Sequence, residues 1–513
     1  MIVFLSLGLL PVVAQAENEN SGPKLYDGNL VVETFVEEIP NDPTTMTFVA
    51  NDILVLQKQD GQVRLIRDGV LQPNPVLDVS VANDAERGML GITASGSTVY
   101  IYYTESDKDG GKAIANHIYK YDWNGEKLVN PILIKELPSV NFYHNGGAMT
   151  AYHGQIYAVI GDNGNYGRLQ NRQSDDWLND TSVILRVDPP GPYYAIGVRN
   201  SFGITIDPMT GNMWDTENGD DEYDEINFVP ENFNSGWIEI MGPAKNQAQV
   251  DALPKYENYT YSDPEFSWQK PVAPTGISFV KSDKLKDYQD SVFVGDCNNG
   301  NLYRLKLDSS RTGFAFKSPE LADRVLNTGE SMGEILLGTG FGCVTDIEMG
   351  PDGLLYIVSL SDGKIYRLIP KAMAEQIDQV PKTDTGAKNG GCLIATATYG
   401  TELSTQVQML REIRDNVLLD TKAGTSFMSE FNQIYYYFSP TVADWERQSP
   451  IFKEIIKTTI TPMLSTLTIL NYVQVDSEQE VMAYGIGIIF LNIAMYFVTP
   501  AVLIIKIRKR FSR

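Results

Sequence analysis

The residues best suited to chemistry gather around one histidine. The chain has 513 residues and three histidines, and His144 stands in the stretch NFYHNGGAM between an aromatic pair and two glycines. Imidazole has an unperturbed pKa of about 6.5, so it can accept a proton at neutral pH. The alternative is that His144 is a structural residue of a turn and forms hydrogen bonds only to the backbone. His153 precedes a turn glycine and His117 lies in an alternating run, so both are expected to be structural.

A second stretch with chemical potential is the acidic segment ENGDDEYDEIN, residues 217–227. Its carboxylates surround a glycine and offer the hard oxygen ligands that Ca²⁺ prefers. Their spacing is not that of an EF-hand. From the residues alone, a solvated acidic loop and a metal site are equal alternatives.

The elements that must position these residues form a repeat between residues 30 and 370. A β-rich run, a turn of Gly, Asp and Asn, and a second alternating run recur, most clearly at 53–66, 292–307 and 355–369. Six related hairpins at spacings of tens of residues indicate radial repetition of a small antiparallel sheet. The prediction is therefore an all-β fold, a six-bladed β-propeller over residues 30–370. No long amphipathic helix supports a parallel α/β sheet here.

Composition limits the partners and the covalent framework. The formal net charge is −24, and such a surface repels the phosphate backbone, so nucleic acid is not expected as a partner. The three cysteines, Cys297, Cys343 and Cys392, lie far apart in the chain and allow at most one disulfide.

Both ends of the chain have the character of targeting segments. Residues 1–16 are apolar and close on Ala-Gln-Ala, which is typical of a secretory signal peptide. Residues 481–505 are uncharged and long enough to form a transmembrane helix. The basic tail, residues 506–513, is then expected in the cytoplasm by the positive-inside rule. We therefore expect an exported protein that a C-terminal helix anchors to the outer face of the membrane.

The composition changes twice between the predicted propeller and the predicted membrane segment. Residues 371–391 end in a polar stretch rich in Gly, Pro and Lys and are expected to form a linker. Residues 392–480 carry apolar positions at helical spacing, and Ser449-Pro450 has the form of an N-cap followed by proline, so a small α-helical region is predicted. Its opening, GGCLIATATYG, resembles the Cys-Phe-Ile box of C-terminal sorting domains on archaeal surface proteins. That resemblance implies surface sorting.

The chemistry-bearing stretches also resemble a known family. The segments FYHNGGAMTAYHGQIYAVIGDNG and IGVRNSFGITIDPMTGNMWDTENGDDEYDEINFV are similar to the PQQ-dependent aldose dehydrogenases, the glucose/sorbosone dehydrogenase family of six-bladed propellers. The resemblance covers roughly residues 30–370. Its most specific features are His144 with the glycines that follow, the pair Arg199-Asn200, and the run 224–227.

The resemblance implies roles for individual residues. His144 would be the general base that takes the proton of the anomeric hydroxyl while hydride passes to the quinone. Arg199 would serve both catalysis and cofactor binding, and Glu86 and Asn200 would also contact the cofactor. The backbone carbonyls of Gly219 and Asp220 would hold a Ca²⁺ that contacts the cofactor. The implied cofactors are PQQ and Ca²⁺, and the implied substrate is a sugar-like small molecule.

Two departures from the family pattern concern cofactor binding. The segment 294–300 has no lysine where the family has one, and Cys343-Val344-Thr345-Asp346 replaces Arg-Ile-Arg-Asp. Three cations that would hold a tricarboxylate are therefore missing. Cys297 and Cys343 fall at these two places, and we expect two buried free thiols there, with a disulfide or a metal pair as alternatives.

Two functional hypotheses follow. In the first, the protein oxidises an aldose sugar outside the cytoplasm by hydride transfer to PQQ. In the second, a non-catalytic surface propeller binds glycan or protein. The retained His144, Arg199 and Asn200 favour the enzyme, and the missing cations favour the binding module.

Overall fold

The computed structural model describes residues 22–378, apart from 68, 165–179 and 257, and several separate stretches beyond them. The longest of these stretches are 393–399, 404–414 and 449–467. The predicted signal peptide and basic tail lie outside the described residues, as do Cys392 and most of the predicted linker.

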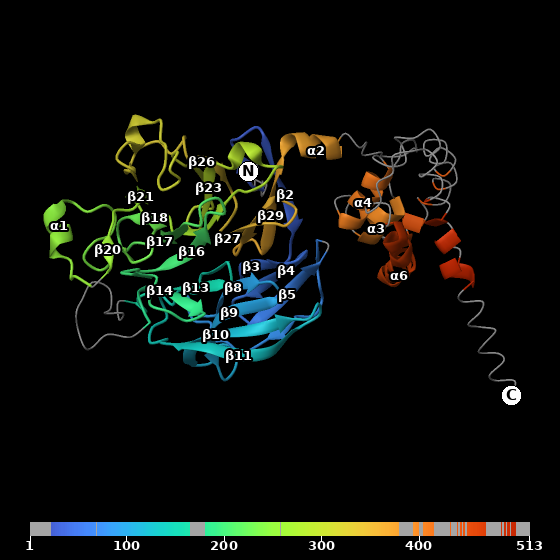
Figure 1. The fold of residues 1–513 in the computed structure, drawn as a ribbon, viewed down its shortest axis with the longest axis horizontal. Helices are drawn as coiled ribbons and strands as arrows, with labels where there is room; N and C mark the ends of the chain where they lie inside the picture. Colours follow the sequence, from blue (N-terminus) through green and yellow to red (C-terminus); the bar gives the residue numbers. More distant parts are fainter. Residues whose placement is uncertain are drawn as a thin grey trace, which may run out of the picture. The chain divides into compact units, whose positions relative to one another are not determined.

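Short strands joined by tight turns make up most of residues 22–370 (Figure 1). The turn glycines explain how the strands reverse. Gly300 in NNG and Gly363 in SDG have φ angles of +66° and +59°, a left-handed conformation that other residues adopt only at a steric cost. The recurrent turns noticed in the sequence therefore do end strands.

Among the described residues the strands form six sheets, most of whose pairings are antiparallel. The first sheet contains β3 (Pro43–Val49), β4 (Asp52–Gln57), β5 (Gln62–Arg67), β6 (Val70–Leu71) and β7 (Leu77–Asp78). The second contains β8 (Met89–Ser95), β9 (Thr98–Ser106), β10 (Ala113–Trp123) and β11 (Leu128–Leu137). The third contains β12 (Met149–Tyr152), β13 (Gln155–Ile160), β14 (Val183–Asp188), β15 (Ala195–Ile196), β19 (Phe233–Asn234) and β20 (Thr260–Tyr261).

The remaining three sheets complete the β region. The fourth contains β16 (Ser201–Ile206), β17 (Met213–Glu217), β18 (Asp224–Val229), β21 (Phe266–Trp268) and β25 (Val325–Leu326). The fifth contains β22 (Pro274–Phe279), β23 (Ser291–Asp296), β24 (Leu302–Lys306), β26 (Leu336–Thr339) and β1 (Lys24–Leu25). The sixth contains β27 (Val344–Met349), β28 (Leu355–Ser359), β29 (Lys364–Pro370) and β2 (Leu30–Val36). Short helices α1 (Gln247–Ala252), η1 (Lys286–Tyr288) and η2 (Pro319–Leu321) lie in the connections.

The sheets are the blades of a propeller, and the predicted all-β propeller is confirmed. The chain divides into two compact units, and five of the six sheets lie wholly within the larger one. This unit therefore has five complete blades, one fewer than predicted, because residues 47–55 and 62–78 of the first sheet group with the second unit. The prediction of six blades counted every hairpin of the sequence as part of one body.

Within the larger unit, the start of β3 and the N-terminal strand β2 complete the ring. β2 pairs antiparallel with β29, which joins the N-terminal strand to the last blade. The backbone N–H of Met46 donates to Asp346 of β27 at 2.8 Å, and Thr44 donates to the carbonyl of Met89 in β8 at 2.9 Å. These contacts join β3 to β27 and to β8, and β8 packs beside β12, the strand that follows His144.

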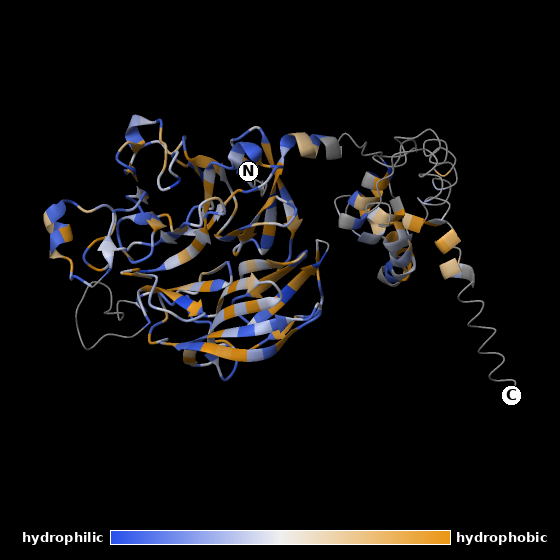
Figure 2. Ribbon diagram, in the orientation of Figure 1, coloured by the Kyte–Doolittle hydropathy of each residue, from blue (hydrophilic) through white to orange (hydrophobic). Residues whose placement is uncertain are grey.

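Apolar cores fill the spaces between neighbouring blades. Tyr102 of β9 and Ile156 of β13 belong to one cluster, and Trp214 of β17 and Val294 of β23 belong to another. Figure 2 shows hydrophobic and hydrophilic residues alternating along the strands, as expected where one side of a strand packs against the next sheet. The buried apolar faces hold the innermost strands at fixed positions.

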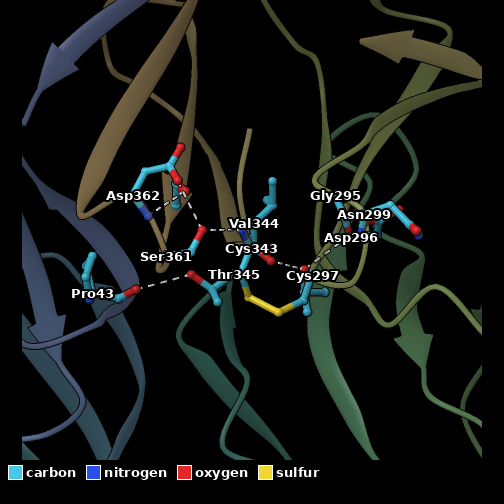
Figure 3. Close-up of a disulfide and its surroundings, with 12 residues drawn as sticks. Pro43, Gly295, Asp296, Cys297, Asn299, Cys343, Val344, Thr345, Ser361 and Asp362 are labelled. Atoms are coloured by element: carbon cyan, nitrogen blue, oxygen red, sulfur yellow. Dashed lines mark hydrogen bonds between the residues drawn. A yellow bond between two sulfur atoms is a disulfide. The ribbon is translucent and has the colours of Figure 1, made fainter. Parts of the chain in front are cut away.

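A disulfide joins Cys297 and Cys343, so the expectation of two free thiols is wrong (Figure 3). Cys297 follows β23 and Cys343 precedes β27, in neighbouring blades. These strand ends approach closely because Gly295 has no side chain, and a Cβ there would overlap Val344. The hydroxyl of Thr275 on β22 also donates to the carbonyl of Val344, which ties the two blades together at the same place.

The region after the propeller is helical, in the segments that the structure describes. α2 (Lys371–Asp378) occupies the start of the predicted linker. Farther along lie α3 (Leu393–Tyr399), α4 (Thr405–Ile413), α6 (Pro450–Leu467) and the π-helical turn η5 (Ala494–Val498). α3, α4 and α6 share a core that contains Tyr399, Val407 and Leu464. α6 begins at Pro450 behind Ser449, as predicted.

The predicted membrane span is described only in part. Among the described residues, no helix is both long and apolar enough to cross a bilayer. Much of 481–505 lies outside those residues, so the anchor remains a prediction.

We predict that the Cys297–Cys343 disulfide stabilises the propeller. It closes a loop with a sequence separation of 46 residues. Replacing both cysteines by serine is expected to lower the free energy of unfolding by about 2 to 4 kcal/mol, because the unfolded chain gains freedom. Urea unfolding of both proteins measures the change. A Cys392→Ser variant is the control, and labelling of all three thiols in the unreduced, denatured protein would contradict the account.

Candidate active site

His144 and Asp162 form a hydrogen-bonded pair at one end of the propeller. Asp162, which follows β13, is fully buried, and its Oδ1 lies 2.6 Å from Nδ1 of His144. Asp162 also accepts the backbone N–H of Gly164 at 2.9 Å and the indole N–H of Trp237 at 2.8 Å. A carboxylate fixed in this way holds the proton of the imidazole on Nδ1 and leaves Nε2 as the basic atom. The side chain of His144 is 13% exposed, so Nε2 belongs to a group that solvent or a ligand can reach.

Glu86 connects His144 to the next blade. Its Oε2 accepts the backbone N–H of His144 at 2.6 Å and the side-chain amide of Asn200 at 3.4 Å. His144 has a φ angle of +57°, which is unfavourable for a residue with a side chain. The bond from Glu86 holds the backbone in this conformation and so aims the imidazole. The carbonyl oxygen of the Asn200 side chain is buried and has no hydrogen-bond partner among the described residues.

Arg199 is the buried cation of the site. Its backbone N–H donates to Glu217 at 2.6 Å. Its Nη1 donates to the carbonyls of Asn218 and Gly219 at 2.9 and 2.7 Å, and its Nη2 donates to Asp220 at 2.9 Å. The Nε–H is buried and unpartnered within the described part of the chain. The guanidinium therefore keeps one donor for a ligand.

Trp237 lies between the base and the cation. Its indole N–H reaches Asp162, and its ring faces the guanidinium of Arg199 at 5.1 Å. The backbone brings the same two residues together, since the N–H of Asp162 donates to the carbonyl of Arg199 at 2.9 Å. Gly161 permits this approach, because a Cβ there would overlap the carbonyl of His144.

The structure thus brings together all six residues that the sequence assigned to the site. Glu86 precedes β8, His144 precedes β12, and Arg199-Asn200 precede β16. These three innermost strands lie side by side, so their starting ends meet at one place. Gly219 and Asp220, in the β17–β18 connection, reach the same place through Arg199.

One of the predicted calcium ligands has another partner. The carbonyl of Gly219 accepts from Arg199, and the side-chain carboxylate of Asp220, which is not the predicted ligand, forms an ion pair with it. No cluster of three or more His, Cys, Asp or Glu side chains suited to a metal is found in the described residues. Calcium at the carbonyls of Gly219 and Asp220 therefore stays a prediction, and an ion there would have to share the Gly219 carbonyl with the guanidinium.

Three buried carboxyl groups lie behind Arg199. Asp215 and Glu217 are two residues apart on β17, and Glu217 is directly opposite Glu225 on β18. Burial raises the pKa of Asp215 to about 7. Burial, with the neighbouring charge of Asp215, raises the pKa of Glu217 to about 8. Burial raises the pKa of Glu225 well above its ordinary value, and the charge of Glu217 raises it further. At neutral pH Glu217 and Glu225 therefore hold protons in the folded protein, and Asp215 is close to its midpoint of protonation.

Among the described residues, Arg304 does not supply one of the missing cations. Arg304 donates to Ser291 at 2.9 Å and stacks on Tyr288 at 4.4 Å, within the fifth blade. Arg168 and Arg172 lie outside the described residues. Lys58 is close enough to Glu86 for its pKa to respond to that charge, although burial is the largest effect and lowers the pKa. Arg199 is the cation for which the structure shows direct contacts within the site.

Comparison with known proteins places this arrangement in a family. Residues 40–367 match the sequence model described as Glucose / Sorbosone dehydrogenase. Aldose sugar dehydrogenase YliI of Escherichia coli K12 is 22% identical over 317 residues, which cover 58% of this chain and 77% of that protein. An uncharacterized protein of Synechocystis is 24% identical over 365 residues, which cover 64% of this chain and 83% of that protein.

Solved structures share the fold. The PQQ-bound aldose sugar dehydrogenase of Streptomyces coelicolor has a TM-score of 0.50 and 22% identity, covering 67% of this chain and 99% of that chain. A putative oxidoreductase (glucose dehydrogenase) of Thermus thermophilus has a TM-score of 0.53 and 22% identity, covering 66% and 100%. Because the family match spans more than half of the sequence, the chain belongs to the glucose/sorbosone dehydrogenase family of PQQ-dependent propellers.

Proposed function

We propose that this protein oxidises an aldose sugar outside the cytoplasm, with PQQ as the electron acceptor. The observation that carries the proposal is the base at the site. Nδ1 of His144 is bound by a buried carboxylate, Nε2 is left as the acceptor, and a buried arginine lies in the next blade. Membership of the family supports the reaction class.

The residues present fit the quinone end of such a cofactor. Arg199 Nε is a buried donor without a partner among the described residues, and the side-chain oxygen of Asn200 is a buried acceptor in the same state. Leaving such atoms unpaired is costly, so a ligand with complementary groups is expected between them. Arg199 and Asn200 would hold PQQ, and Glu86 would fix Asn200 against it.

The chain's own part in the reaction is to place and deprotonate the sugar. Nε2 of His144 takes the proton of the anomeric hydroxyl, and Asp162 holds the imidazole in position as it becomes charged. When bound, PQQ supplies a quinone that can accept the two electrons of the C1–H bond as hydride. The guanidinium of Arg199, which the ring of Trp237 holds in place, would supply positive charge to offset the negative charge of the reduced cofactor.

The missing cations predict a weaker hold on the carboxylates of PQQ. A disulfide occupies the place where the family has a lysine and arginines. Each charge-assisted hydrogen bond contributes about 1.5 to 3 kcal/mol, so the loss lowers affinity by orders of magnitude unless a metal compensates. We include Ca²⁺ at the oxygens of Gly219 and Asp220 in the proposal for this reason.

The extracellular location also belongs to the proposal. The apolar first residues, the uncharged segment 481–505 and the basic tail support export and anchoring at the outer face. The Cys297–Cys343 disulfide supports an oxidising compartment. The sorting role of the region after residue 392 rests on its sequence alone.

A second function is favoured by one observation. The disulfide in place of the cofactor-binding cations fits a propeller that binds glycan or protein without catalysis. The two functions differ in the need for PQQ. Titration with PQQ therefore separates them.

We predict that His144→Gln abolishes turnover without abolishing cofactor binding. Loss of the base is expected to lower the rate at least about 100-fold. Dye reduction by the full chain, supplied with PQQ, Ca²⁺ and an aldose, gives the rate. His153→Gln, at an exposed histidine, is the matched control and should keep full activity. A His144→Gln variant with more than half the original rate would show that another group is the base.

We predict that Arg199→Met weakens PQQ binding. The variant loses a charge-assisted hydrogen-bond donor, so the Kd for PQQ is expected to rise about 10- to 100-fold. Isothermal titration of the full chain with PQQ in Ca²⁺ measures it. Arg186→Met is the control, because Arg186 also pairs with a carboxylate and stacks on tyrosine but lies on β14. Equal affinities for all three proteins would remove Arg199 from the cofactor site.

We predict that the folded protein loses stability as pH rises from 5.5 to 8.5. The ordinary pKa values of Asp215 and Glu217 are 3.8 and 4.5, and the folded values are about 7 and about 8. Folding raises the pKa of both carboxyl groups. Their contribution to the free energy of unfolding is therefore complete below the pKa values of the unfolded chain, and it is lost as the pH rises through the pKa values of the folded protein.

The free energy of unfolding in urea should fall by about 2 to 5 kcal/mol over that range. Asp215→Asn should reduce the pH dependence, whereas Asp221→Asn, at an exposed position, should not. Stability that rises toward pH 8.5 would contradict the burial of protonated carboxyl groups.

A further inference from the structure

The loop that leads to His144 exposes apolar side chains beside the site. Val140, Phe142 and Tyr143 are 54%, 51% and 52% exposed, and Tyr143 is the residue immediately before the base. Single exposed aromatic side chains are common on protein surfaces, but adjacent ones form an apolar patch of the kind found at binding surfaces. Neither the family match nor the proton transfer accounts for them.

The loop is held in place, so the exposure is a fixed property of the fold. The backbone N–H of Val140 donates to Asn163 at 3.2 Å, and that of Tyr143 donates to Asn141 at 3.2 Å. The carbonyl of Phe142 accepts from the backbone of Glu86 at 3.2 Å. A rigid loop presents its aromatic rings without an ordering cost when a ligand binds.

The two aromatic rings have different surroundings. The guanidinium of Arg87 lies 4.8 Å from the ring centre of Phe142, and Arg87 is itself buried and bonded to the carbonyl of Ser139 at 2.8 Å. Phe142 therefore has one occupied face. No contact of this kind is found for the ring of Tyr143, and its hydroxyl has no hydrogen-bond partner among the described residues. Tyr143 is the ring left for a ligand.

The mixed charges around the loop favour a neutral ligand. Glu86 and Asp162 are in contact with His144, and the side chain of Asp220 is 60% exposed, while the guanidinium groups of Arg199 and Arg87 lie in the same region. Carboxylates accept hydrogen bonds from hydroxyl groups and repel phosphates and carboxylates. A sugar ring meets both demands, because its C–H face packs on an aromatic ring while its hydroxyls can donate to an exposed carboxylate such as that of Asp220.

We propose that Tyr143, with Phe142 beside it, is a platform for the ring of a neutral sugar at the mouth of the site. This inference rests on the proposed function, since it assigns the substrate of the same base. The sugar ring packs on Tyr143, and one of its hydroxyl groups then meets Nε2 of the adjacent His144. Phosphorylated sugars and sugar acids are excluded by the carboxylates.

The test measures the kinetics of three variants of the full chain: Tyr143→Ala, Tyr143→Phe and the control Tyr26→Ala. D-glucose is the neutral substrate, and glucuronate and glucose 6-phosphate are the anionic ones. Tyr26 is 55% exposed and lies outside the site, so it matches Tyr143 in type and exposure. Tyr143→Ala should raise KM for glucose about tenfold and change kcat less than about twofold. Tyr143→Phe should restore most of the affinity, and the anionic sugars should give little turnover.

A second measurement separates this inference from the proposed function. Binding of glucose to the protein without PQQ, followed by ligand-observed NMR, needs no catalysis. Saturable binding that Tyr143→Ala weakens about tenfold, in a protein without turnover, would keep the platform and overturn the dehydrogenase. Turnover with an unchanged KM in Tyr143→Ala would keep the dehydrogenase and overturn the platform. Equal thermal melting of the variants shows that a loss of binding is not a loss of fold.

Discussion

The carboxylate of Asp162 is the interaction on which the rest of the site depends. It is fully buried, and it accepts hydrogen bonds from the imidazole of His144, the indole of Trp237 and the backbone N–H of Gly164. Its own N–H bonds to the carbonyl of Arg199 in the next segment of the chain. A buried carboxylate must have such donors, because leaving it without them would cost several kcal/mol. The requirement to satisfy Asp162 therefore also sets the distance between the base and the cation.

The propeller supplies this arrangement through the starting ends of its innermost strands. Glu86, His144 and Asn200 precede three neighbouring strands, and apolar clusters between the blades fix how those strands lie. The site that results is rich in carboxylates and has one arginine with direct contacts. In the proposed function, this charge balance favours a neutral substrate and makes the binding of an anionic cofactor depend on Arg199 and on any metal bound beside it.

The sequence predicted those parts of the structure that local pattern determines. Alternating apolar runs and glycine turns identified the β-propeller, and the short motifs around His144 and Arg199 identified residues that do meet in space. Trp237 was missed because its bond to Asp162 joins residues 75 positions apart and no motif marks it. The disulfide was predicted only as an alternative to two free thiols, because it depends on the close approach of two blades at Gly295, which spacing in the sequence does not reveal. The blade count differed because part of the first sheet groups with a second unit.

The central claim is that a sugar delivers its electrons to a quinone held at this site, with His144 as the base. The most direct measurement is single-turnover absorbance of PQQ bound to the full chain in Ca²⁺, after mixing with excess D-glucose and without an added electron acceptor. The account predicts that the absorbance changes from that of the oxidised to that of the reduced cofactor, with one sugar oxidised per bound PQQ. Tight binding of both ligands with no change in absorbance, or no binding of PQQ at high micromolar concentration, would contradict it and leave a sugar-binding propeller without catalysis.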